Sequence, residues 1–289
     1  TASFTLDGEN KGITLSHFDV TIARSLREAE PQTEVFTTPT DADIPYRIPA
    51  IATTNEGHLV AVADYRHSRT DIGFAGSASG RIDLHARISR DGGATWGEVT
   101  TIVEGQGASS PDAFHTGFGD PCIVADRETD RILVLSCAGD VSFPGGTREH
   151  HQGIARFESL DGGRTWSEPT DLSESIYRQL DQSARGPVKA MFIGSGKIHQ
   201  SRYTKVGDTY RLYCAVLVRD VDGTYCNYVL FSDDFGLSWS ILGDADVPPI
   251  PSGADEPKTE ELPDGSIVIS SRCTGGRQYN IYTFTDSRR

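Results

Sequence analysis

An eight-residue pattern that occurs three times constrains the fold of this chain more than any other feature of its sequence. The copies begin at Ser89, Ser159 and Ser232, and each reads Ser-x-Asp-x-Gly-x-Thr/Ser-Trp. The chain contains three tryptophans, and each of them closes a copy. Ser and Asp side chains bond nearby backbone groups, Gly adopts a positive φ and the Trp ring packs under the turn, so the pattern predicts a rigid hairpin turn. Its aspartates are therefore interpreted as turn residues at an outer rim and not as catalytic carboxylates. They are Asp91, Asp161 and Asp234.

Short strand-like segments surround the repeated turns. Segments with the apolar alternation or the apolar runs of strands are 58–63, 82–88, 132–137, 210–218, 227–231 and 266–271. The best helical candidate is short and covers 174–180. Evenly spaced strands with one turn signature per unit predict an all-β chain folded as a β-propeller, with one four-stranded sheet in each blade. The copies lie further apart than the roughly 40–50 residues of a simple blade, so long loops must leave some blades, and loops carry sites.

Composition excludes several classes of function. The 289 residues carry a net charge of −14, which argues against nucleic acid or an anionic membrane as the main partner, because phosphate binding needs a basic face. The longest apolar run, 132–138, is far shorter than the roughly 20 residues of a membrane span. The five cysteines show no CxxC spacing, and four of them lie in apolar strand-like runs, as buried free thiols do. The histidines lack metal-ligand spacing, so we expect neither a metal nor another cofactor.

The repeated turn is known as the Asp box, and it occurs here together with Tyr46-Arg47-Ile48-Pro49. In this combination the chain resembles the bacterial sialidases (neuraminidases), the exo-α-sialidases of glycoside hydrolase family thirty-three, from about residue 40 to its end. The resemblance implies a six-bladed propeller, of which this chain holds about four blades. Residues 1–40 are then a lead-in segment, and residues 41–289 are the N-terminal two thirds of the catalytic propeller. The resemblance also implies a secreted, periplasmic or cell-surface protein.

Arginines and aspartates near the first strands match functional residues of that family. Arg47 matches the first of three arginines that clamp the sialic acid carboxylate, and a planar guanidinium suits this role because it binds a carboxylate through two hydrogen bonds. Arg66 resembles the arginine that holds the 4-hydroxyl side of the sugar. Asp71 falls where the family has its acid/base aspartate, with Asp64 as the competing assignment. Asp120 resembles a second aspartate near the 4-hydroxyl, with a turn role before the following proline as the rival interpretation.

A second group of site residues lies near the end of the chain. The resemblance implies that Glu256 activates the nucleophile and that Arg272 is the second arginine of the carboxylate clamp. Glu260 and Glu261 are the alternatives to Glu256, and we expect both to be solvated because they stand close to a Pro-Asp-Gly turn. Phe143 is a candidate for the lining of an acetamido pocket.

The family's third arginine and its nucleophilic tyrosine normally follow the second arginine by several tens of residues, but 17 residues follow Arg272. Some side chains there have the right chemistry but stand in no matching context, namely Arg277, Tyr279, Tyr282, Arg288 and Arg289. Residues 284–289 resemble the opening of a fourth Asp box. We therefore expect a C-terminal segment or a second chain to complete the propeller and to supply the tyrosine.

The implied reaction is hydrolysis of terminal α-linked sialic acid from glycoproteins, glycolipids or oligosaccharides, with retention. Sialic acid carries a carboxylate on its anomeric carbon, so a neutral tyrosine activated by a glutamate avoids the charge repulsion that a carboxylate nucleophile would meet. We expect a basic pocket in an otherwise acidic surface. Two alternatives remain open, a sialoglycan-binding module without catalysis and a trans-sialidase.

Overall fold

The computed structural model describes residues 33–38, 46–74 and 80–283. The chain divides into two units, Thr1–Glu34 and Val35–Arg289, and the fold described here is that of the second unit. The predicted lead-in segment and the predicted start of a fourth Asp box fall almost entirely outside the described residues. Within those residues, no helix is long and apolar enough to cross a membrane.

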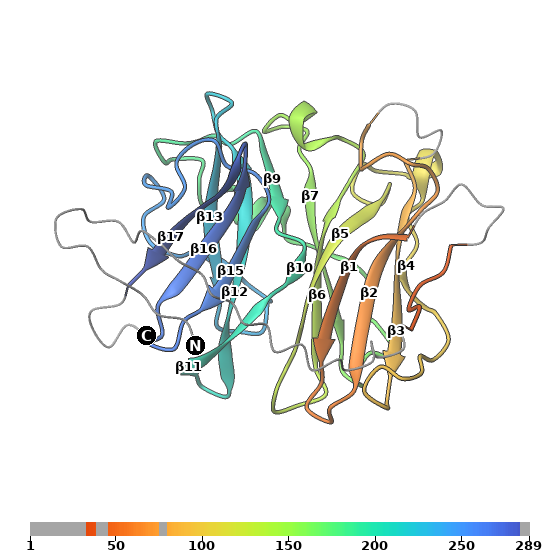
Figure 1. Ribbon diagram of the computed structural model, residues 1–289. Coiled ribbons are helices and arrows are strands. Elements are labelled where there is room, and N and C mark those ends of the chain that lie inside the picture. Colours follow the sequence, from red (N-terminus) through yellow and green to blue (C-terminus); the bar gives the residue numbers. More distant parts are fainter. Residues whose placement is uncertain (1–32, 39–45, 75–79, 284–289) are drawn as a thin grey trace. The chain divides into compact units, whose positions relative to one another are not determined.

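Four sheets of mostly antiparallel strands make up the described part of this unit (Figure 1). The first sheet contains β1 (Tyr46–Thr53), β2 (Leu59–Arg66), β3 (Ile82–Ser89) and β4 (Thr100–Val103). The second contains β5 (Phe118–Ala125), β6 (Ile132–Ala138), β7 (Gly153–Ser159), β8 (Thr170–Asp171) and β10 (Gly196–Lys197). The third contains β9 (Ala190–Ile193), β11 (His199–Val206), β12 (Thr209–Arg219), β13 (Tyr225–Ser232) and β14 (Ser240–Ile241). The fourth contains β15 (Pro257–Glu261), β16 (Ile267–Cys273) and β17 (Gly276–Tyr282).

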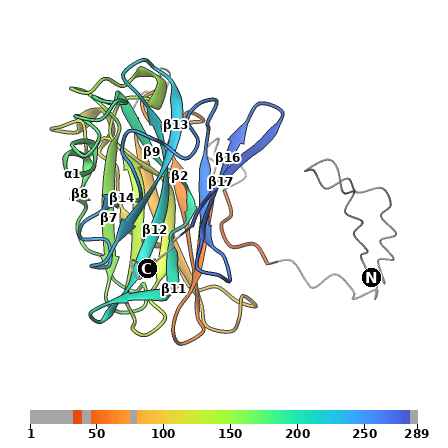
Figure 2. The ribbon, with the colours of Figure 1, turned by 90° about the vertical axis from the view of Figure 1, so that its left-hand side faces the viewer.

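The all-β propeller prediction is confirmed, and the four sheets are its blades. Every strand predicted from apolar pattern is present, and the predicted helix is α1 (Ser173–Tyr177), which lies beside β7 and β8 (Figure 2). Two short 3₁₀ helices, Gly107–Ser109 and Phe143–Gly145, lie in loops. All seven side chains of β6 are buried, because blades pack on both faces of a central blade strand. Four cysteines are buried free thiols, as predicted.

The three Asp boxes form the same hydrogen-bonded turn between the third and fourth strands of their blades. In the second box the Asp161 carboxylate accepts hydrogen bonds from the backbone N–H of Thr165 at 2.9 Å, from the Thr165 hydroxyl at 2.7 Å and from the Ser159 hydroxyl at 2.8 Å. Asp91 and Asp234 make the corresponding bonds in the other two boxes. The boxes are therefore structural, as the sequence predicts.

The inner strands β1 and β5 each contain a bulge next to a proline. Pairing of β1 with β2 shifts between Arg47 and Ala50, and pairing of β5 with β6 shifts between Gly119 and Cys122. Within these bulges Ile48 and Asp120 have φ of 50° and 56°, a left-handed conformation that few residues other than glycine adopt. Each precedes a proline, which lacks the N–H that a regular strand needs. Bulges redirect side chains, and these two lie at the same edge of adjacent blades.

Candidate functional site

A pocket of about 170 Å³ lies at the edge where the two bulges occur. It receives side chains from all four blades or from the loops that leave them. Its lining residues are Arg47, Ile48, Asp71, Ile72, Phe74, Asp120, Phe143, Gln152, Phe192, Leu217, Asp255 and Glu256. Four of the six site residues predicted from sequence are among them, although they are far apart in the chain. The other two, Arg66 and Arg272, each contact a lining carboxylate.

Arg66 lies beneath the pocket and is fully buried. Its Nε and Nη2 donate to Oδ2 of Asp64 at 3.1 and 2.9 Å, and its Nη1 donates to Oδ1 of Asp71. Its Nη2 is also 4.0 Å from Oδ1 of Asp120. One buried guanidinium therefore serves three carboxylates.

Asp71 and Asp64 occupy different environments, which bears on the choice between them as proton donor. Asp71 follows β2, its side chain is half exposed to the pocket, and its Oδ1 is 3.5 Å from Nη1 of Arg47. Asp64 lies inside β2 and is completely buried. A group that exchanges protons with substrate must reach it, and of the two only Asp71 lines the pocket.

Asp120 is buried, and its proton affinity is unusual. Burial, together with the charges of Asp71 and Glu256, raises the pKa of Asp120 to about 6 against the opposing charges of Arg66 and Arg47. These four charged groups are the lining or supporting residues predicted from sequence. The Asp120 side chain lines the pocket and its backbone forms the β5 bulge, so both interpretations of this residue describe part of its environment.

Arg272 contacts the two carboxylates at the Glu256 side of the pocket. Its Nε and Nη2 donate to Oδ2 of Asp255 at 2.9 and 2.7 Å, and its Nη1 is 3.2 Å from Oε2 of Glu256. The hydrogen bonds from Arg272 to Asp255, with the nearby Glu256 charge, raise the pKa of the guanidinium. Both carboxylates precede β15, while Arg272 lies on β16, so one hairpin presents all three.

One wall of the pocket is apolar. Phe143, in the loop after β6, packs edge-to-face on Phe192 of β9, with ring centroids 6.4 Å apart, and Leu217 of β12 lies on the same wall. Gln152 lines the pocket, and its Oε1 is buried without a hydrogen-bond partner in the described part of the chain. This wall fits a small apolar group that carries an N–H donor.

The structure corrects two sequence-based expectations. Glu261 is buried and not solvated, because its carboxylate accepts bonds from the Ser201 hydroxyl and from the backbone N–H of Arg202, both at 2.6 Å. Glu260 is partly exposed and pairs with Lys197 at 2.7 Å. The pocket itself is not basic, since among its described lining residues four carboxylates accompany one arginine.

Sequence reasoning missed several pocket residues. Asp255 is adjacent to Glu256 and contacts the predicted Arg272, so its position was the signal that could have identified it. Gln152, Phe192 and Leu217 belong to no motif. They line the pocket because blades two and three pack together, and no local sequence pattern predicts this packing.

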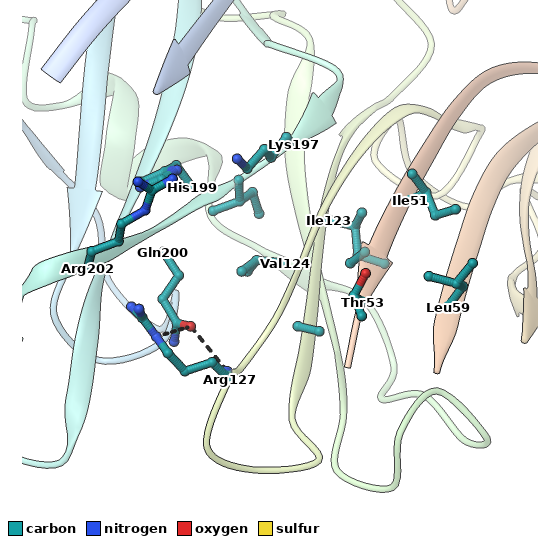
Figure 3. A pocket seen from close by; sticks show the side chains of 13 residues that line it. Ile51, Thr53, Leu59, Ile123, Val124, Arg127, Lys197, His199, Gln200 and Arg202 are labelled. Atoms are coloured by element: carbon teal, nitrogen blue, oxygen red, sulfur yellow. Dashed lines mark hydrogen bonds between the residues drawn. The ribbon is translucent and has the colours of Figure 1, made fainter. Parts of the chain in front are cut away.

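A larger hollow of about 540 Å³ lies at the other ends of β1 and β5. Figure 3 shows a polar wall and an apolar wall, which carry Arg127, Lys197, His199, Gln200 and Arg202 on one side and Ile51, Leu59 and Ile123 on the other. Its described lining includes no carboxylate, and Arg127 is already bonded to Gln200. The smaller pocket gathers four carboxylates, whereas the ionisable groups that line the hollow are Arg127, Lys197, His199 and Arg202. In the described part of the chain, no cluster of His, Cys, Asp and Glu could hold a metal ion.

Comparison with known proteins agrees with this assignment of the fold. A family model described as a BNR repeat-like domain matches residues 72–288. The chain belongs to the BNR repeat-like family. It is similar to a sialidase of Micromonospora viridifaciens, with 32% identity over 236 residues that cover 78% of this chain and 32% of that protein. It is also 31% identical over 147 residues to a sialidase of Bacteroides fragilis, covering 47% of this chain and 26% of that protein.

Two solved structures share the fold. A Hadza microbial sialidase superposes with a TM-score of 0.65 at 24% identity, covering 84% of this chain and 47% of the other. The intramolecular trans-sialidase of Ruminococcus gnavus gives 0.62 at 15% identity, covering 83% of this chain and 68% of the other. The chain thus spans about a third or less of the two sequence relatives named above and about half of the Hadza structure.

Proposed function

We propose that the full-length protein is an exo-α-sialidase that hydrolyses terminal α-linked sialic acid from glycoproteins, glycolipids and oligosaccharides, with retention. The observation that carries the proposal is the convergence of Arg47, Asp71, Asp120 and Glu256 in one pocket. These residues come from three different blades and the loops that leave them, and the sequence resemblance selects them independently of the geometry. A propeller used only as a scaffold gives no reason for this convergence.

Arg47 and Arg272 bind the substrate carboxylate in this proposal. Both guanidiniums are paired with carboxylates in the absence of substrate, Arg47 with Asp71 and Arg272 with Asp255 and Glu256. A substrate carboxylate therefore exchanges one ion pair for another, and the arginines are held in place before it arrives. The apolar wall around Phe143 then receives the acetamido group.

Asp71 and Glu256 move the protons. Asp71 donates a proton to the glycosidic oxygen as the bond to the anomeric carbon breaks. At the same time Glu256 accepts the phenolic proton of a tyrosine whose oxygen bonds to that carbon. In the second half, the Asp71 carboxylate accepts a proton from the attacking water, and Glu256 returns its proton to the departing tyrosine. Arg66 and Asp120 hold the 4-hydroxyl side of the sugar.

The tyrosine and the third arginine come from the part of the propeller that follows these four blades. No tyrosine is among the described lining residues of the pocket, and the chain spans only part of its relatives. We propose that a C-terminal segment, or a second chain, closes the propeller and supplies both groups. Because the substrates are displayed on secreted and cell-surface glycoconjugates, the protein acts outside the cytoplasm, as a secreted, periplasmic or cell-surface enzyme.

Release of a fluorogenic phenol from its sialoside by the full-length protein tests the proposal. Asp71→Ala and Glu256→Ala should each lower kcat/KM by about 10²–10⁴-fold, the usual contribution of a general acid or base. Glu256→Ala should change Tm little, whereas Asp71→Ala also removes a charged partner of the buried Arg66 and should lower Tm. Glu260→Ala is the matched control, because Glu260 lies on the same hairpin outside the pocket and should leave the rate unchanged. Binding of sialosides without turnover would contradict the proposal and favour a sialoglycan-binding module. A product assay with added lactose separates hydrolysis from transfer.

A further inference from the structure

The buried carboxylate of Asp64 joins two blades directly below the pocket. Asp64 lies on β2, and its side chain has no exposed surface. Its Oδ2 accepts the two hydrogen bonds from Arg66, and its Oδ1 accepts the backbone N–H of Asp120 at 2.9 Å. The first contact lies within blade one, while the second crosses to β5 of blade two.

The contact with Arg66 determines where that guanidinium points. Arg66 is fully buried, and a buried guanidinium is costly unless charged partners surround it. Asp64 binds the Nε and Nη2 side of the group, which leaves Nη1 directed at Asp71. The position of Asp71, the proposed proton donor, therefore depends on Asp64 through Arg66.

The contact with Asp120 fixes a strained part of the backbone. Asp120 has φ of 56° inside the β5 bulge, and its N–H is not used in the strand ladder there. Asp64 bonds this N–H and so holds the bulge that directs the Asp120 side chain into the pocket. The approach is close: a Cβ on Gly119 would lie 3.3 Å from Oδ2 of Asp64.

We propose that Asp64 is a positioning residue for this site, and that its one carboxylate sets both Asp71, through Arg66, and Asp120, through the β5 bulge. The expected effect on kcat rests on the proposed function. The positioning of Asp71 and Asp120 by Asp64 does not depend on it. Asp64 has no access to substrate and takes no part in proton transfer.

Asp64→Asn in the full-length protein tests the proposal, because it keeps the shape of the side chain and removes its charge. Loss of alignment of this kind costs on the order of 10²-fold in rate, so kcat should fall by about that factor while KM changes less.

The second measurement on this variant is the titration of Asp120, followed by carboxyl-carbon NMR and assigned with Asp120→Asn. Its midpoint should move to lower pH, because the carboxylates of Asp64 and Asp120 repel each other when both are ionised, and because Arg66 is freed to face Asp120. The charged groups that face Asp120 are Arg47, Asp64, Arg66, Asp71 and Glu256.

Glu261→Gln is the matched control. Glu261 is also a buried carboxylate that bonds a backbone N–H of the neighbouring blade, but it lies at the far end of β15 from the pocket. The Glu261→Gln variant should have a lower Tm than the wild type but an unchanged kcat and an unchanged Asp120 titration. If Asp64→Asn does not fold, Gly119→Ala replaces it, since the added methyl would lie 3.3 Å from the Asp64 carboxylate and press it out of its position by a few tenths of an ångström without altering any charge. This variant should also lower kcat.

The two proposals fail in different ways. If the wild-type protein does not hydrolyse sialosides, the proposed function is wrong, and the Asp120 titration still decides the role of Asp64. If Asp64→Asn lowers only Tm, as Glu261→Gln does, and leaves kcat and the Asp120 titration unchanged, Asp64 is merely structural and the inference is overturned.

Discussion

At the scale of single residues, the buried carboxylate of Asp120 lowers the stability of the fold at neutral pH. Burial raises the pKa of Asp120 from its usual 3.8 to about 6, so the folded protein binds this proton more tightly than the unfolded chain. Stability from this group is fully present below pH 4 and is lost as the pH rises towards 6. At neutral pH the ionised carboxylate costs about 2–3 kcal/mol.

Asp120→Asn should therefore stabilise the fold in a pH-dependent way. Asparagine is neutral at every pH and tolerates the left-handed conformation of this position. Urea unfolding should show the variant to be more stable than the wild type at pH 7.5, by up to about 2–3 kcal/mol, with a much smaller difference at pH 4. An equal difference at both pH values would contradict this account of the Asp120 charge.

At this scale the sequence identifies several site residues but does not show which carboxylates are buried. Arg47, Asp71 and Glu256 could be selected because each stands in a recognisable local motif. The burial of Asp64 and Glu261 could not be predicted, because each is buried by a partner blade more than fifty residues away, Asp64 by Asp120 and Glu261 by Arg202.

At the scale of elements, each Asp box ties the third strand of a blade to the fourth. Asp234→Ala removes the three hydrogen bonds that hold the third box, to the Ser232 hydroxyl and to the hydroxyl and backbone N–H of Ser238. By analogy with the loss of a helix N-cap, it should lower the free energy of unfolding by about 1 kcal/mol. Urea unfolding measures the change.

Asp208→Ala is the control for this prediction, because Asp208 is an exposed aspartate of the β11–β12 turn. It should change stability by less than about 0.5 kcal/mol. Neither variant should alter hydrolysis. An Asp234→Ala variant with reduced kcat and normal stability would show that the box acts on the site, against its structural interpretation.

At the scale of the whole molecule, four blades expose surfaces that a closed propeller covers. The fourth sheet has three described strands, and on its outer strand β17 the side chain of Tyr279 is 73% exposed. On the inner strand β1, Ile51 is 56% exposed. Closure by further blades removes such edges.

Cysteine labelling of the full-length protein tests closure. Ile51→Cys and Tyr279→Cys should react slowly with a maleimide. Leu160→Cys should react fast, because Leu160 lies in an Asp box at the outer rim and is 70% exposed. The native cysteines provide the background rate, since four of the five are buried. Equal rates at all three positions would mean that nothing covers the open edges.

The architecture was predictable at this scale because one turn repeats in each of the first three blades and marks them along the chain. The charge of the pocket was not predictable, because it depends on which carboxylates the blades bring together. Asp255 lines the pocket beside Glu256, Asp71 and Asp120, and this gathering outweighs the arginine that the Arg-Ile-Pro motif identifies.

A crystal structure of the full-length protein with a bound unsaturated sialic acid analogue tests the central claim most directly. The ligand carboxylate should lie within hydrogen-bond distance of the Arg47 and Arg272 guanidiniums, with Asp71 near the glycosidic position and the acetamido group against Phe143. A ligand bound instead in the hollow beside Lys197 and Arg202, or a pocket left empty at saturating ligand, would contradict the claim.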